Sequence, residues 1–123
     1  MNVTARMIGA LAVVLSSACQ TPAPAEPPQP APMTASATAY CQSGTTKSGQ
    51  QTRAGVIAAD PRVLPLGSTV RIDAPDDEHD GVYYVADTGS GIKGAEVDIY
   101  MASCRRAIRF GRRTVAVHVI EWG

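Results

Sequence analysis

A dense run of prolines divides this chain, because six of its nine prolines lie between Pro22 and Pro32. Residues 20–36 carry Glu26 as their only charge, and a stretch of this composition favours extended, polyproline-like conformations without a buried core. We therefore predict a semi-rigid linker over 20–36 and one folded domain over 37–123, which is 87 residues. A domain of that size buries only about 60–65% of its unfolded surface, so a covalent cross-link would help to stabilise it. Two-domain architectures and large cofactor folds are excluded.

The first 19 residues have the pattern of an export signal peptide. Arg6 supplies the positive charge, residues 7–15 form a short apolar run, and small residues precede Cys19. Such a run is too short for a permanent membrane-spanning helix, which needs about 20 residues. Cys19 after Ala18 resembles the lipidation site of bacterial lipoproteins. This implies an exported protein anchored by lipid, facing the periplasm from the outer membrane; simple cleavage near Ala18 without lipidation is the alternative.

The cysteine count agrees with export. Setting Cys19 aside leaves Cys41 and Cys104, one near each end of the predicted domain. Two such cysteines usually pair in an exported protein. We therefore predict a Cys41–Cys104 disulfide, with two buried free thiols as the alternative.

Charge argues against a nucleic-acid partner, because residues 37–123 hold ten basic and ten acidic side chains and create no general field for phosphate backbones. The acidic cluster over 73–80 and the arginine cluster over 105–113 are typical of a solvated loop and a solvated helix face. Residues 77–80 could hold a metal loosely, but a turn between strands explains them better. We predict no metal, no cofactor and a monomer.

The domain is predicted to be mostly β. One helix is expected over 102–110, where Met101, Cys104, Ala107 and Ile108 share a face and Gly111 occupies the C-cap position. Six stretches have the alternation and β-branched residues of strands, namely 38–41, 55–59, 70–73, 81–86, 96–100 and 114–122. Six short strands and one late helix favour a small closed β-barrel.

Three local patterns have simpler explanations than catalysis. The glycines of 89–94 match a dinucleotide-binding pattern, but a predicted strand follows where that site needs a helix, so they are turn residues. Residues 87–89 read Asp-Thr-Gly, the aspartic-protease triplet, yet that chemistry needs two facing aspartates. His118, in an apolar strand, is predicted to be a hydrogen-bonded core histidine.

The most informative pattern extends across the whole domain. Its four stretches are 38–41, 58–68, 85–94 and 97–100. Taken together and in order, they closely resemble the three-aspartate, or 3D, domain family, which occurs in membrane-bound lytic transglycosylase A and in small cell-wall proteins related to resuscitation-promoting factors. The resemblance implies a six-stranded double-psi β-barrel, and it carries the three family aspartates onto Asp60, Asp87 and Asp98.

The resemblance also implies an activity on peptidoglycan. A lytic transglycosylase cleaves the β-1,4 bond between N-acetylmuramic acid and N-acetylglucosamine, and it leaves a 1,6-anhydro end. One carboxyl protonates the leaving oxygen and then accepts the proton of the sugar's 6-hydroxyl. An ordinary aspartate is only about a thousandth protonated at pH 7, so burial or a nearby carboxylate must raise its pKa. We predict Asp98 as this acid/base, with Asp87 and Asp60 shaping the site and raising that pKa.

Strand alternation supports the placement of Asp98. In 96–100, Val97 and Ile99 are expected to face the barrel interior, so that Asp98 and Tyr100 face outward, where a glycan could lie. Asp87 ends a strand just before a glycine-rich loop that allows close approach of the substrate. The predicted substrate-binding residues are Thr88, Gly89, Lys93 and Tyr100.

Two departures from the family pattern leave a second function open. Residues 89–91 read Gly-Ser-Gly where the family usually has two adjacent glycines and an alanine. In addition, membrane-bound lytic transglycosylase A has a second domain that completes its cleft, whereas a lone barrel offers an open groove. The alternative is a non-catalytic, wall-binding barrel of the expansin-related kind. Only the enzyme would yield anhydro-muropeptides.

Overall fold

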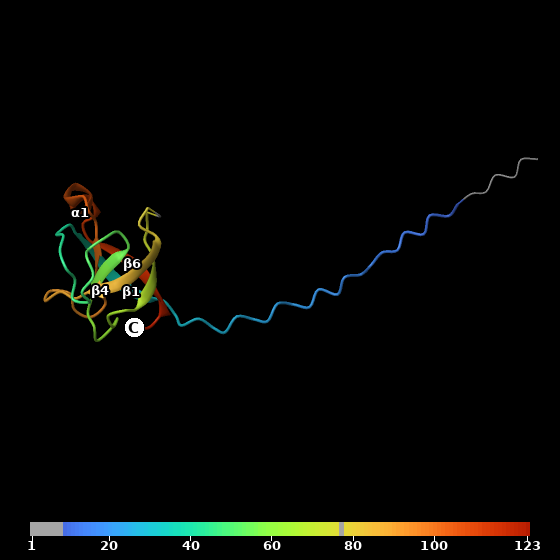
Figure 1. Ribbon diagram of the computed structural model, residues 1–123, viewed down its shortest axis with the longest axis horizontal. Helices are drawn as coiled ribbons and strands as arrows, with labels where there is room; N and C mark the ends of the chain where they lie inside the picture. The colour runs from blue at the N-terminus through green and yellow to red at the C-terminus, as the bar shows by residue number, and fades with distance from the viewer. Residues whose placement is uncertain (1–8, 77) are drawn as a thin grey trace, which may run out of the picture.

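The secondary structure lies in the C-terminal three quarters of the chain. The computed structural model describes residues 9–76 and 78–123. The start of the predicted signal peptide, residues 1–8, and Asp77 of the acidic cluster lie outside the described residues. Residues 9–32 contain neither helix nor strand and leave the barrel as one extended segment (Figure 1). Among the described helices, none has the length and apolar character needed to cross a membrane.

The described residues form six strands and one short helix, and these elements occur in the predicted order. The elements are β1 (Met33–Tyr40), β2 (Val56–Ala59), β3 (Thr69–Asp73), β4 (Gly81–Asp87), β5 (Glu96–Tyr100), α1 (Cys104–Phe110) and β6 (Arg113–Glu121).

The six strands close into a barrel in the order β1-β5-β2-β4-β3-β6. The pairs β1/β5 and β2/β4 are parallel, and the other four pairs are antiparallel. The consecutive strands β1 and β2 are separated by β5 in the barrel, and β4 and β5 are separated by β2, so the segments after β1 and after β4 each pass over an intervening strand. The predicted double-psi β-barrel with a short helix before its last strand is confirmed.

The first strand differs most from its prediction. β1 begins at Met33, five residues before the predicted start at 38 and inside the predicted linker. Its first half pairs with β6 and its second half with β5, and Ala35 and Ala37 are buried in the core. Alanine is a poor strand former, so the buried alanines gave this early part of the strand only a weak signal in the sequence, although Thr34 is β-branched.

The helix is also shorter than predicted and buries a different face. Ser103 is its N-cap, with a side chain that accepts from the Arg106 N–H, and Gly111 closes it at φ +61°. The buried helical residues are Ala107 and Phe110. Ile108 was predicted to share the buried face, and this was wrong, because its side chain is 81% exposed. The helix lies against one end of the barrel, and Ile108 is turned about 100° away from Ala107.

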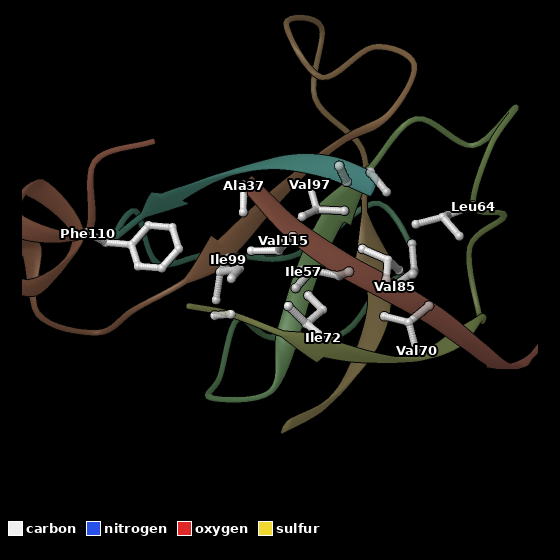
Figure 2. Packing of buried hydrophobic residues seen from close by; sticks show 14 of the residues in the cluster. Ala37, Ile57, Leu64, Val70, Ile72, Val85, Val97, Ile99, Phe110 and Val115 are labelled. Atoms are coloured by element: carbon white, nitrogen blue, oxygen red, sulfur yellow. The ribbon is translucent and has the colours of Figure 1, made fainter. Parts of the chain in front are cut away.

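The barrel interior is filled by branched side chains from β2 to β6 and by alanines from β1 (Figure 2). Val97 and Ile99 of β5 both lie in this core, as strand alternation predicted. Asp98, which lies between these two core residues, therefore points away from the barrel interior. Labelled core residues in the figure include Ala37, Ile57, Leu64, Val70, Ile72, Val85, Phe110 and Val115.

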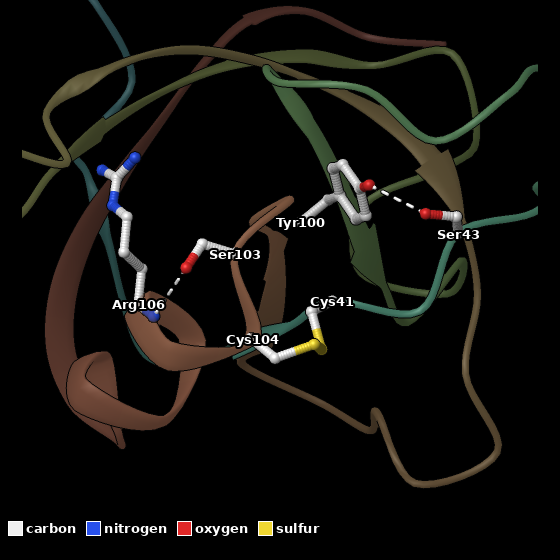
Figure 3. The surroundings of a disulfide bond; sticks show 6 residues. All are labelled: Cys41, Ser43, Tyr100, Ser103, Cys104 and Arg106. Carbon is white, nitrogen blue, oxygen red and sulfur yellow. Dashed lines mark hydrogen bonds between the residues drawn. A yellow bond between two sulfur atoms is a disulfide. The ribbon is translucent and has the colours of Figure 1, made fainter.

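The predicted disulfide is confirmed. Cys41, directly after β1, is bonded to Cys104, the first residue of α1, with an S–S distance of 2.07 Å and a Cα–Cα distance of 5.0 Å (Figure 3). The bond links positions 63 residues apart and attaches the helix to the end of the first strand. Cys19 is exposed and has a free thiol.

Candidate functional site

A row of four paired residues crosses the outer surface of the barrel. Thr38 of β1 pairs with Asp98 of β5, Asp98 pairs with Ala58 of β2, and Ala58 pairs with Asp87 of β4. Paired residues point to the same side of a sheet, and neighbouring strands lie about 4.8 Å apart. The two aspartates are thus separated by two strand spacings, roughly 10 Å between Cα atoms, across a small alanine.

A bulge brings Asp87 into this row. The pairing of β2 with β4 shifts between Ile57 and Ala58, so that Ala58 faces Asp87 instead of Ala86. Bulges turn a side chain toward a new direction at the end of a strand. Here the shift leaves Ala86 buried and places the carboxyl group beside the cavity.

The row borders a surface cavity of about 340 Å³, a size typical of small-molecule sites. Its walls come from the end of β1 and the segment that follows, from the middle of β2 and β5, and from the loop after β4. The lining residues are Tyr40, Gln42, Ser43, Gly44, Thr45, Thr52, Ala58, Asp87, Thr88, Gly89, Ile92 and Asp98.

Asp98 is half-buried at the centre of the row. Its Oδ1 accepts a hydrogen bond from the Thr38 hydroxyl at 3.0 Å. Burial raises the pKa of Asp98 above its usual value, while the Thr38 hydrogen bond and the positive charge of Arg112 oppose the rise. Burial disfavours the charged form of a carboxyl, so the site shifts this aspartate toward the protonated state that a general acid needs.

Asp87 ties two walls of the cavity together. Its Oδ1 accepts hydrogen bonds from the backbone N–H groups of Lys47 and Thr88, both at 2.9 Å. The neighbouring Ser48 N–H donates to the Ala86 carbonyl at 3.0 Å. One carboxyl oxygen of Asp87 therefore holds the segment after β1 against the loop after β4, and this contact shapes the cavity.

Asp60 lies elsewhere and does not line the cavity. Only 1% of the residue is exposed, and its carboxyl accepts three hydrogen bonds from Arg62 and one from the Gly94 N–H, at 2.8 to 3.1 Å. The Arg62 side chain, followed by the backbone donors, holds the pKa of Asp60 well below its usual range. Asp60 is thus a charged anchor for the loop between β4 and β5.

Comparison with known proteins agrees with this geometry. The model of the 3D domain matches residues 55–121 of the chain. The chain belongs to the 3D domain family. Over 98 residues this 3D domain protein is 39% identical to YabE, which is named for cell wall shaping, and to the cell wall-binding protein YocH, both of Bacillus subtilis (strain 168). Each alignment covers 72% of this chain but only 23% of YabE and 32% of YocH, so the chain spans about a quarter to a third of these relatives.

Solved structures share the barrel. MltA from E. coli, a lytic transglycosylase, superposes with a TM-score of 0.54 at 19% identity, over 65% of this chain and 28% of that one. MltA with bound chitohexaose gives a TM-score of 0.50 at 18% identity, over 62% of this chain and 28% of that one. At such identities the likeness establishes the fold of the 3D domain alone.

Two tyrosines support the cavity of the 3D domain in different ways. Tyr100 was predicted to bind substrate, but it is buried outside the cavity lining, and its hydroxyl lies 3.2 Å from the Ser43 hydroxyl (Figure 3). Tyr40 packs edge-on against the Tyr100 ring at 5.4 Å. The buried Tyr40 hydroxyl has no hydrogen-bond partner among the described residues. Burial and then the charges of Asp87 and Asp98 raise the pKa of Tyr40 to about 12.

Of the remaining predicted site residues, two line the cavity and one lies outside it. Thr88 and Gly89 line the cavity, whereas Lys93 is exposed outside it and its backbone N–H donates to Glu96. The turn predicted over 89–94 is present, with Ile92 N–H donating to the Gly89 carbonyl at 3.0 Å. A Cβ at Gly89 would lie 2.8 Å from Ile92 Cγ1, so a larger residue there would displace the Ile92 side chain.

Sequence reasoning missed Thr38, Tyr40 and Ala58 as parts of the site. Thr38 and Tyr40 lie within the first stretch that matches the 3D family, on alternate positions of one strand, and this parity was an available signal. Ala58 had no such signal, because its role is to be small between two carboxyl groups.

Two polar clusters lie away from the cavity. The ligand atoms of Asp76, Glu78 and His79 lie within 4.8 Å of one another, but Arg113 and Arg106 form ion pairs with these two acids, as expected of a charged surface turn. His118 is hydrogen-bonded, as predicted, with Nε2 2.8 Å from Asp73 Oδ2. It lies outside the core, however, because its neighbour Val117 takes the inward position.

Proposed function

We propose that this 3D domain is a peptidoglycan lytic transglycosylase that cleaves the N-acetylmuramic acid–N-acetylglucosamine β-1,4 bond and forms 1,6-anhydro-N-acetylmuramic acid. The observation that carries the proposal is the half-buried carboxyl of Asp98, whose pKa is raised by burial at the edge of a surface cavity. The barrel shared with the lytic transglycosylase MltA supports the same class of reaction.

The proposed reaction needs one carboxyl group in two roles. Protonated Asp98 donates its proton to the bridging oxygen as the bond from that oxygen to C1 breaks. The oxygen of the muramic acid 6-hydroxyl then bonds to C1, and its proton passes to the Asp98 carboxylate, which restores the acid. Because Thr38 occupies Oδ1, Oδ2 is the oxygen that exchanges the proton. General acid–base catalysis of this kind contributes about a hundredfold to ten-thousandfold.

The other cavity residues assist this chemistry in the proposal. The carboxylate of Asp87, on the far side of Ala58, stabilises positive charge that develops on the sugar ring in an oxocarbenium-like transition state. A phenol with a pKa of about 12 stays neutral. The Tyr40 hydroxyl is buried behind the cavity wall without a partner among the described residues, and in the proposal it turns toward the cavity to donate a hydrogen bond to the bound glycan. Thr88 and Gly89 form the side of the cavity along which the glycan chain lies.

We further propose that the protein works outside the cytoplasm on a tether. The Cys41–Cys104 disulfide suits an oxidising compartment, and Cys19 is the proposed lipidated residue on the outer membrane. As a polyproline-like spacer, residues 20–32 would reach about 40 Å. Mass spectrometry of the mature N-terminal peptide tests this: an acylated Cys19 is expected, and a soluble mature chain without acyl mass would contradict the tether.

A non-catalytic wall-binding barrel is the second candidate function. It is favoured by the relationship to the cell wall-binding protein YocH. In that case the cavity would hold the glycan without cutting it.

Mass spectrometry of peptidoglycan digests separates the two functions. Purified sacculi are incubated with the wild-type protein or with Asp98→Asn, and soluble products are analysed for the 1,6-anhydro group. Enzymatic function predicts anhydro-muropeptides from the wild type and a loss of at least a hundredfold in the variant. Sedimentation with sacculi is the control, since both proteins should still bind. Binding without any anhydro product from the wild type would establish the wall-binding function instead.

A further inference from the structure

The exposed side of α1 carries an apolar side chain that the barrel does not use. Ile108 is 81% exposed, although its neighbour Ala107 packs against the core. A second surface depression, of about 510 Å³, begins beside this isoleucine. Its wall includes Ala39, Ala107 and the disulfide-bonded residues Cys41 and Cys104, so the depression is apolar on the side of the helix.

This depression is continuous with the candidate active site. It shares Tyr40, Gln42 and Asp98 with the first cavity, so the two hollows adjoin along these three residues. A ligand whose reacting bond lies over Asp98 therefore has one hollow on each side. The first is lined by polar loop residues, and the second by the disulfide and Ile108.

The helix beside the second hollow is strongly basic. Arg105 precedes Ile108 by three residues, a spacing that places two side chains on the same side of a helix. Among residues 9–76 and 78–123, no carboxylate lies within ion-pair distance of Arg105. Arg112, four residues after Ile108, donates to Ser36 at 2.8 Å, and its charge already acts on Asp98. Arg112 is also paired with Glu96 at 3.5 Å, so the positive charge without an ion-pair partner beside this hollow comes from Arg105 on the helix that borders it.

We infer that the second hollow binds the acidic peptide carried by the muramic acid residue, so that the preferred substrate is peptide-bearing rather than bare glycan. This inference rests on the proposed function. The peptide is attached to the same sugar ring whose C1 reacts over Asp98, which places it within reach of the adjoining hollow. Its methyl side chains match Ile108 and the disulfide, and its free carboxylates match Arg105.

The test compares two forms of one substrate. Sacculi freed of other wall polymers by acid treatment are used intact or after amidase digestion, which leaves peptide-free glycan strands. Binding of the full chain in mild detergent and release of anhydro products are measured on both. The wild type is expected to bind the peptide-bearing form about tenfold more tightly, since both an apolar contact and an exposed ion pair are added.

Variants locate the preference. Arg105→Gln and Ile108→Ser should each weaken binding to the peptide-bearing form about three- to fivefold, and both should leave binding to peptide-free strands unchanged. The Arg105 effect should shrink at high salt, because exposed charges are screened. Arg71→Gln is the matched control: it removes one exposed arginine from β3, away from both hollows, and should keep the full preference.

The outcomes separate this inference from the proposed function. Equal binding of both substrates by the wild type, or equal weakening of both by Arg105→Gln, would overturn the inference and leave the proposed activity intact. An Arg105 effect seen only before acid treatment would assign the hollow to an anionic wall polymer and also overturn it. A preference for the peptide-bearing form without any anhydro product would support the inference while contradicting catalysis.

Discussion

The corner after β2 and the outer face of β5 each hold an aspartate of the family pattern, and they treat its carboxyl group in opposite ways. Asp60 is 1% exposed, accepts four hydrogen bonds and has a lowered pKa. Asp98 is half-buried, accepts one hydrogen bond from Thr38 and has a raised pKa. Burial alone therefore does not decide the direction. What decides it is whether donors compensate the buried charge.

The largest expected effect separates the two aspartates by activity. Asp98→Asn should reduce the release of anhydro-muropeptides by about a hundredfold to ten-thousandfold. Its thermal stability at neutral pH should be unchanged or slightly higher. The sign follows from the raised pKa: the folded state disfavours charged Asp98, so ionisation costs stability as the pH rises above the ordinary pKa, and the neutral amide removes that cost. A variant that cuts at the wild-type rate would remove Asp98 from the mechanism.

Removal of the disulfide tests whether the region around Asp98 and the region around Asp60 are stabilised independently. Replacing Cys41 and Cys104 by alanine should lower the free energy of unfolding by up to about 4 kcal/mol in the chain-entropy model, measured by urea unfolding. Hydrogen exchange should increase first around Tyr40 and the cavity, because the bond anchors the end of β1 to α1. Protection near Asp60 should change less. Equal unfolding curves with and without reductant in the wild type would contradict this prediction.

Asp60→Asn should affect stability much more than chemistry. The charged form contributes stability that is fully present above the ordinary aspartate pKa of about 4, and this stability is lost as the pH falls through the lower folded-state pKa. The melting temperature of the variant should therefore fall at pH 7 and approach that of the wild type in strong acid. Thermal melts from pH 7 to pH 2 measure this. Activity lost at unchanged stability would instead give Asp60 a direct catalytic role.

The smallest expected effect concerns the partnerless hydroxyl beside Asp98. Tyr40→Phe should lower kcat/KM about tenfold, since a hydrogen-bond donor to the glycan is lost, while the melting temperature stays the same or rises. The loss should be constant from pH 5 to pH 9, because a group with a pKa of about 12 does not titrate there. A destabilised variant with full activity would show that the hydroxyl serves the fold alone.

Much of the fold followed from local patterns. The bounds of β5 match the predicted 96–100, and the six strands, the single late helix and the Gly111 cap all occur in the predicted order. These features depend on short-range alternation and turn chemistry. β1 and the exposed Ile108 were mispredicted, because burial of alanines and the docking angle of a short helix depend on the neighbouring strands.

The candidate site was predicted only in part, and Asp87 shows why. Its position before a glycine-rich turn was readable, but its place in the row with Ala58 and Asp98 comes from a one-residue bulge. A bulge changes which side chain faces a neighbour without leaving a clear mark on hydrophobic alternation.

The sequence by itself determined that Asp98 faces outward between core residues Val97 and Ile99, because alternation along a strand is a local property of the chain. It also determined that Cys41 and Cys104 would pair, because the number of cysteines can be counted directly. Only the tertiary structure decided which aspartates meet. Barrel closure brings β5, β2 and β4 side by side and delivers the Gly94 N–H to Asp60, 34 residues away. The pKa of a carboxyl group is set by such distant donors and by burial, so chemically identical side chains acquire different roles only once the chain has folded.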